Sequence, residues 1–183
     1  KARGATWQVL GQQVLKGKLN IPVIHPEELA QLELSEYARP RVEQTQQLAP
    51  YGLPSNLDAW DGYPAARERL FAMLTAHATN PISLAGDTHN GWAFNLTNQK
   101  GEAVGVEWGT PGVSSPGLER YVPLPPERMQ ALLKGASPEL VTCDTSQRGW
   151  THVTLTPEAA TAQWRFVSSV VEPSYQVSAG APL

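Results

Sequence analysis

The chain has 183 residues, enough for one domain of ordinary size with its own hydrophobic core. Hydrophobic residues make up 41% and charged residues 17%, with 15 glycines and 16 prolines, a composition typical of a folded, loop-rich protein and not of a disordered one. The formal net charge of −3 gives no electrostatic reason to expect a nucleic-acid or membrane partner, and no apolar run approaches the roughly 20 residues of a transmembrane helix.

The first part of the chain carries helical patterns. A short amphipathic helix is predicted over residues 7–15, because apolar residues recur there at i, i+3 and i+7: Trp7, Leu10 and Val14. The stretch 18–57 is rich in Gln, Glu and Pro and only weakly patterned, which predicts an insertion on the surface. Within it, a helix is expected to begin at Pro26 and to end before Pro40.

A second helix and a buried strand are predicted next. Pro64 suits the first turn of a helix that runs to about His77. Its expected apolar face consists of Leu70, Met73, Leu74 and His77. After Asn80-Pro81, the short apolar run 82–85 stops at Gly86, as a buried strand does where it enters a polar loop.

Strand patterns dominate the rest of the chain. Residues 92–96 and 104–108 alternate in polarity around a polar turn, which predicts an antiparallel hairpin. A helix is predicted from Pro125-Pro126 to Gly135, which would end it. The runs 150–156 and 162–171 predict a second hairpin. Strands mixed with helices in this way indicate an α/β fold.

The densest group of candidate functional side chains is Gly86-Asp87-Thr88-His89-Asn90, at the end of the predicted buried strand. In an extended segment, residues two apart point the same way, so Asp87 and His89 would offer an oxygen and a nitrogen to one metal ion or to two adjacent ones. Gly86 would let the backbone approach the ions closely. The same residues are typical of a solvated turn, which spacing alone favours, although it leaves both interpretations open.

The remaining histidines and the cysteine carry weaker signals. His25, His77 and His152 have no ligand spacing with His89, and we interpret them as structural. Cys143 is the single cysteine, which excludes an internal disulfide and a cysteine-cluster zinc site. Because no base or ligand spacing accompanies it, we interpret it as a small inert side chain.

Two polar stretches resemble active-site motifs only superficially. The stretch 58–64, Asp-Ala-Trp-Asp-Gly-Tyr-Pro, combines a turn pair with a helix start and is typical of a corner in the chain. In the stretch 112–116, the order Gly-Val-Ser-Ser-Pro does not match the G-x-S-x-G elbow of serine hydrolases. Neither stretch therefore predicts catalysis.

Several segments, taken in order, resemble the C-terminal half of the PhoD-like alkaline phosphatases, a branch of the binuclear metallophosphoesterases. The resemblance covers most of the chain outside 18–57, and the ordered set is far more specific than any one segment. The segments are Trp7-Gln8-Val9-Leu10-Gly11-Gln12-Gln13, Trp60-Asp61-Gly62-Tyr63-Pro64-Ala65-Ala66-Arg67, Leu84-Ala85-Gly86-Asp87-Thr88-His89, Val106-Glu107-Trp108-Gly109-Thr110-Pro111-Gly112-Val113-Ser114-Ser115-Pro116-Gly117 and Arg148-Gly149-Trp150.

This resemblance implies a fold and a set of site residues. Residues 1–183 would form the C-terminal portion of a calcineurin-like sandwich of two sheets with flanking helices. Asp87 and His89 would be metal ligands, because G-D-x-H replaces the G-H-x-H of other metallophosphoesterases. Asn90 would be a catalytic residue near the substrate phosphate.

The resemblance also implies the chemistry and its setting. The expected cofactors are iron(III) and calcium, the expected reaction is hydrolysis of phosphomonoesters or phosphodiesters, and the expected location is periplasmic or secreted. Two cations a few ångströms apart would bind the phosphoryl oxygens, lower the pKa of a bound water, and hold the attacking and leaving oxygens in line.

The sequence departs from the family pattern in one respect. The family's upstream ligand segments, among them a G-D-x-x-Y motif, have no counterpart, and Gly86-Asp87 is the single Gly-Asp pair. Two ligands cannot fill two metal sites, since each ion needs roughly four to six donors. We therefore expect a C-terminal piece or a truncated relative that is inactive alone, whose partners are the missing N-terminal half and a phosphate-ester substrate.

A non-catalytic binding or docking domain is the alternative function. In that case the six tryptophans and the Gly- and Pro-rich loops would form a ligand surface. We expect Trp60, Trp92, Trp108 and Trp164 to lie instead in the core or on a sheet face, because a tryptophan in an alternating strand usually packs against its neighbours.

Overall fold

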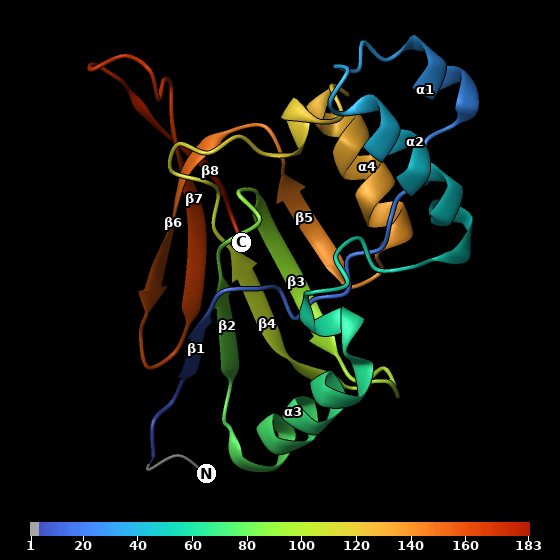
Figure 1. Ribbon diagram of the computed structural model, residues 1–183. Helices are drawn as coiled ribbons and strands as arrows, with labels where there is room; N and C mark the ends of the chain where they lie inside the picture. Colours follow the sequence, from blue (N-terminus) through green and yellow to red (C-terminus); the bar gives the residue numbers. More distant parts are fainter. Residues whose placement is uncertain (1–3) are drawn as a thin grey trace.

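Two β-sheets and a layer of helices build residues 4–183, the part of the chain that this computed structural model describes (Figure 1). The larger sheet has the strand order β1-β2-β4-β3-β5, with β1 Gln8–Gln12, β2 Pro81–Ala85, β3 Gly91–Thr97, β4 Ala103–Gly109 and β5 Leu140–Asp144. The smaller, antiparallel sheet contains β6 Arg148–Leu155, β7 Ala160–Val167 and β8 Val177–Pro182. The α-helices are α1 Pro26–Gln31, α2 Arg39–Leu48, α3 Pro64–His77 and α4 Pro126–Ala136, and short 3-10 turns lie at η1 Ala49–Tyr51, η2 Trp60–Gly62 and η3 Leu118–Arg120.

The larger sheet is covered on both faces. One hydrophobic cluster joins it to α3 and α4 and includes Phe71, Trp92, Phe94, Met129 and Leu133. A second cluster joins it to the smaller sheet and consists of Ile82, Ala93, Trp108 and Ala162. Because side chains alternate along a strand, β3 supplies residues to both clusters. The mixed α/β architecture of two sheets with flanking helices confirms the predicted fold class.

The prediction of a helix over 7–15 is wrong, because this segment contains β1. The strand pairs in parallel with β2, and Val9 lies opposite Ile82. Parallel partners come from distant parts of the sequence, so a local apolar spacing that fits a helix does not reveal them. Pairing with β2 decides the conformation here.

The stretch 18–57 forms α1 and α2 with their connecting loops. The predicted helix begins at Pro26 but ends at Gln31, and a second helix, α2, begins at Arg39. Pro40 lies in the first turn of α2, where proline is tolerated, so it starts a helix and does not end one. Ile24 is buried in the cluster that also holds α3 and α4.

The helix at Pro64 is confirmed as α3, and Leu70 and Leu74 of its predicted apolar face pack against the core. Arg67 and Phe71 are buried, whereas Met73 is 58% exposed. Arg67 lies one turn before Phe71 on the inward side of α3, where it forms an ion pair with Glu139. A polar residue on the inward side of a helix cannot be recognised from apolar spacing.

Most of the remaining elements agree with their predictions. β2 ends before Gly86, and β3 with β4 and β6 with β7 form the two expected hairpins. The predicted helix at 125–135 is α4, which continues to Ala136, so Gly135 lies within its last turn. Strands β5 and β8 were not predicted. Within the described residues, no helix has the length and apolar character needed to cross a bilayer.

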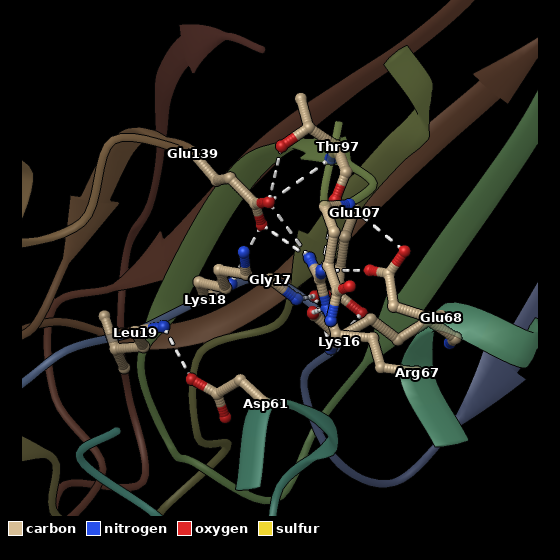
Figure 2. A network of polar contacts seen from close by, with 11 residues as sticks. Lys16, Gly17, Lys18, Leu19, Asp61, Arg67, Glu68, Thr97, Glu107 and Glu139 are labelled. Atoms are coloured by element: carbon tan, nitrogen blue, oxygen red, sulfur yellow. Dashed lines mark hydrogen bonds and ion pairs between the residues drawn. The ribbon is translucent and has the colours of Figure 1, made fainter. Parts of the chain in front are cut away.

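The irregular segment 16–20, which follows β1, donates consecutive backbone N–H groups to buried side chains. Figure 2 shows most of this polar network. The N–H groups of Lys16 and Gly17 donate to Glu107 at 2.8–3.0 Å. Those of the next three residues donate to Glu139 (3.0 Å), Asp61 (3.0 Å) and Ser137 (2.9 Å). These acceptors satisfy backbone groups that have no secondary-structure partner.

The network contains buried charges. Arg67 donates to both carboxylate oxygens of Glu139 and to the Lys16 carbonyl (Figure 2). Burial raises the pKa of Glu107 and lowers that of Lys16 to about 8, because removal from water penalises the charged forms. The pKa of Asp61 is also raised by burial, although the Leu19 N–H opposes this shift.

Candidate functional site

The loop 86–90, which we call the GDTHN loop, joins β2 to β3. Both strands pair with β4, β2 in parallel and β3 antiparallel, so the chain reverses direction between them. Asp87 and His89 have φ values of 63° and 61°, which lie in the left-handed region. The loop is therefore tightly bent, and the assumption of an extended segment is wrong. The reversal between two strands of one sheet requires this bend.

Asp87 is exposed at the start of the GDTHN loop. Its Oδ1 accepts a hydrogen bond from Gln13 Nε2 at 3.3 Å, and the Gly86 N–H donates to the Gln13 carbonyl at 3.0 Å. The segment that follows β1 therefore orients the aspartate. An exposed carboxylate with one weak partner keeps lone pairs free for a cation.

His89 is exposed as well, and its ring is oriented by the loop that follows β4. The ring Nδ1 lies 3.1 Å from the carbonyl oxygen of Pro116, which can only accept a hydrogen bond. In the neutral imidazole the proton therefore sits on Nδ1, and Nε2 carries the lone pair. The Gly112 N–H also donates to the His89 carbonyl at 3.0 Å. In metal sites, the histidine ring nitrogen that does not bind the metal commonly donates its N–H to a backbone carbonyl or a carboxylate.

Asn90 differs from the two residues before it, because it is only 3% exposed. Its Oδ1 accepts the Leu118 N–H at 3.0 Å, and its Nδ2 donates to the Thr88 carbonyl at 2.6 Å. The bond from Leu118 connects the GDTHN loop to η3. The catalytic assignment of Asn90 stays a prediction.

Thr88 carries a further contact that the sequence did not indicate. The indole Nε1 of Trp92 donates to the Thr88 hydroxyl oxygen at 2.6 Å. The segment 110–118, which supplies Pro116, Gly112 and Leu118, was also absent from the predicted site. The sequence did offer one indication that this segment belongs to the site: the segments that resemble the family include residues 106–117.

The donor set fits part of a metal site. A carboxylate oxygen suits a hard cation and an imidazole nitrogen suits a transition metal, so Asp87 and His89 have appropriate chemistry. Among residues 4–183, no group of three or more histidine, cysteine, aspartate or glutamate side chains is arranged to hold an ion. The residues present therefore fit a partial coordination sphere.

The other candidate residues have structural surroundings. His25, His77 and His152 are exposed on separate elements. Asp61 shapes the corner before α3 by accepting the Leu19 N–H. Cys143 is buried, and burial raises the pKa of its thiol to about 12, which confirms its interpretation as inert.

The tryptophans pack largely as predicted. Trp92, Trp108 and Trp164 are buried, and Trp60 is partly buried with its Nε1 donating to Gln12. Trp150 is 41% exposed on β6. Buried indoles cannot contribute to a ligand surface, so the geometry favours the loop at 86–90 as the candidate site.

Comparisons with known proteins point to one family. Residues 1–164 match the family model described as PhoD-like phosphatase. The chain is 28% identical over 131 residues to alkaline phosphatase D of Bacillus subtilis strain 168, a match that covers 69% of this chain and 22% of that protein.

A solved structure described as "Structure of PhoD" superposes with a TM-score of 0.65 at 23% sequence identity. This match covers 99% of the chain and 30% of the other. The chain thus spans less than a third of either relative, and the structural likeness supports the fold. Because the family model matches most of the sequence, the chain belongs to the PhoD-like phosphatase family.

Proposed function

We propose that this chain takes part in metal-dependent hydrolysis of phosphate esters and supplies Asp87 and His89 as metal ligands. The hydrogen bond between His89 Nδ1 and the Pro116 carbonyl carries the proposal, because it leaves Nε2 free and aims the ring. Membership in the PhoD-like phosphatase family supports the reaction class.

Each residue of the GDTHN loop has a role in this proposal. The Asp87 carboxylate contributes negative charge toward a cation, and Gln13 restricts its rotation. His89 contributes Nε2 of its neutral ring as a ligand, and the Pro116 carbonyl at Nδ1 selects the tautomer that makes this possible. Bound cations would supply a water of lowered pKa and charge for the phosphoryl oxygens. We propose iron(III) and calcium as these cations because the family resemblance implies them, and carboxylate oxygen and imidazole nitrogen are compatible with that pair.

The two ligands require help from other polypeptide. We propose that the remaining donors lie in upstream segments like those of the family, so that the 183-residue chain alone does not turn over substrate. A periplasmic or secreted location belongs to the same proposal and rests on the family alone.

Two measurements test the proposal. The purified 183-residue chain, supplied with iron(III) and calcium, should not hydrolyse p-nitrophenyl phosphate or bis(p-nitrophenyl) phosphate above background. Sustained turnover by the chain alone would refute the incomplete site.

The second measurement uses a polypeptide that joins this chain to an upstream half carrying the family's other ligands. There, His89→Ala should abolish hydrolysis and lower the bound metal content measured by elemental analysis. The control is His77→Ala, since His77 is an exposed histidine at the end of α3. Equal activity and metal content in the His89 and His77 variants would exclude His89 as a ligand.

A further inference from the structure

We propose that Trp92 is a positioning residue that sets the shape of the GDTHN loop through the Thr88 hydroxyl. The expected effect on metal binding rests on the proposed function, since Thr88 lies between the two proposed ligands. The effect on loop shape rests on one contact, the 2.6 Å hydrogen bond from Trp92 Nε1 to Thr88 Oγ1.

The donor in this contact belongs to the rigid core. Trp92 is 1% exposed and lies in β3 between Gly109 of β4 and Cys143 of β5. Its ring stacks on Phe94 with centroids 6.2 Å apart. A Cβ on Gly109 would approach Trp92 Cδ1 to 2.7 Å, so the indole packs directly against the β4 backbone. The indole N–H therefore points at Thr88 from a fixed place.

The acceptor lies where the loop most needs support. Residues on both sides of Thr88 adopt left-handed backbone conformations that non-glycine residues avoid. Each polar heavy atom of Thr88 takes part in a hydrogen bond: its N–H donates to the Gly86 carbonyl, its carbonyl accepts from Asn90, and its hydroxyl oxygen accepts from Trp92. Two of these bonds are local to the loop, whereas the third connects the loop to the sheet.

This division of contacts explains why the indole bond matters for the ligands. Other parts of the chain hold the neighbouring residues of the loop, through Gln13, the loop after β4 and the Leu118 N–H, but among the hydrogen bonds of Thr88 the indole bond is the one that reaches beyond the loop. The bond from Trp92 anchors the residue between Asp87 and His89 and so limits the directions in which their side chains extend. Loss of a partner that orients a metal ligand typically lowers metal affinity by about 10- to 100-fold.

Paired variants separate this role from general packing. Thr88→Val removes the hydroxyl at nearly constant shape, Thr88→Ser retains it, and Trp92→Phe removes the indole N–H. Thr154→Val is the matched control, because Thr154 is exposed in β6, where valine is well tolerated. Thr88→Ser should behave as the wild type, and adding Trp92→Phe to Thr88→Val should change the loop no further.

The primary readout is NMR of the 183-residue chain without metal. In the Thr88→Val variant, the His89 ring nitrogens should shift toward a mixture of tautomers, and amide exchange at 87–90 should accelerate while β3 stays protected. Unchanged His89 shifts and loop exchange in this variant would overturn the positioning role. Because this measurement needs no metal, it tests the positioning role of Trp92 even if the proposed metal-dependent function is refuted.

A second readout uses the polypeptide with the complete ligand set. Thr88→Val should weaken metal binding by about 10- to 100-fold, and Thr88→Ser should restore it. Failure of His89→Ala to affect metal would refute the proposed function. A large effect of His89→Ala with none of Thr88→Val would refute the positioning role alone.

Discussion

The imidazole of His89 and the carbonyl of Pro116 form a 3.1 Å contact between two loops that follow different strands. The same two loops meet again where the Gly112 N–H donates to the His89 carbonyl at 3.0 Å. The loop after β4 therefore holds His89 by its ring and by its backbone. Changes in that loop should affect the histidine directly.

Gly112→Ala is expected to displace His89. A Cβ at this position would lie 3.1 Å from His89 Cβ and 2.9 Å from the Ser115 carbonyl oxygen, so the backbone must shift. The His89 ring signals in NMR should move, and metal affinity in the complete ligand set should fall by roughly tenfold. Gly11→Ala is the control, since a Cβ there meets nothing within 4 Å. Identical ring signals in both variants would contradict the prediction.

Glu139→Ala should strongly destabilise the fold. It would remove the buried carboxylate that pairs with the Arg67 guanidinium and leave only the longer contact with Glu68 at 3.6 Å, a loss of about 3–5 kcal/mol in the free energy of unfolding. Urea denaturation measures this loss. The comparison variant is Glu28→Ala, which breaks the exposed pair with Arg128 and should cost far less. Similar losses of unfolding free energy in the two variants would show that the buried Arg67–Glu139 pair contributes no more to stability than the exposed pair.

Lys16→Met should change how stability depends on pH. The pKa of Lys16 is lowered by burial from 10.5 to about 8, so between these values the unfolded chain binds a proton that the folded chain does not. The unfolding free energy of the wild type, relative to the variant, should therefore rise from pH 8 to about 10.5 and level off above it. Urea titrations at several pH values measure this difference. A difference that stays flat would mean that Lys16 remains charged in the fold.

Gly17→Ala should destabilise the chain at the start of the irregular segment. An added Cβ would approach the ring carbons of Phe94 to 2.3–2.7 Å, and such overpacking costs about 1–3 kcal/mol. Gly135→Ala provides a contrast with the opposite sign, because this glycine lies in α4 with open space around it. Alanine there should stabilise by roughly 0.5–1 kcal/mol. Thermal denaturation measures the change in stability of both variants relative to the wild type. An unchanged stability of Gly17→Ala would refute the close packing of Gly17 against Phe94.

Several features were predictable from the sequence because their causes are local. Prolines in the first turn mark α3 and α4, and the hairpins follow from alternating polarity around turns. The Gly-Asp-Thr-His-Asn run was recognisable by residue type and by its place in the ordered family segments. Local preferences and motif order were sufficient for these features.

The sequence alone therefore determined the class of fold, the family and the loop that holds the candidate ligands. Tertiary structure decided the conformation of β1, which depends on pairing with β2, and the place of Arg67 on the inward side of α3, where it pairs with Glu139. It also decided how His89 is oriented, since the Pro116 carbonyl, 27 residues away in the sequence, reaches the ring only in the folded chain. Contacts between distant residues leave no periodic trace in the sequence, so the geometry of the site became visible only in the folded chain.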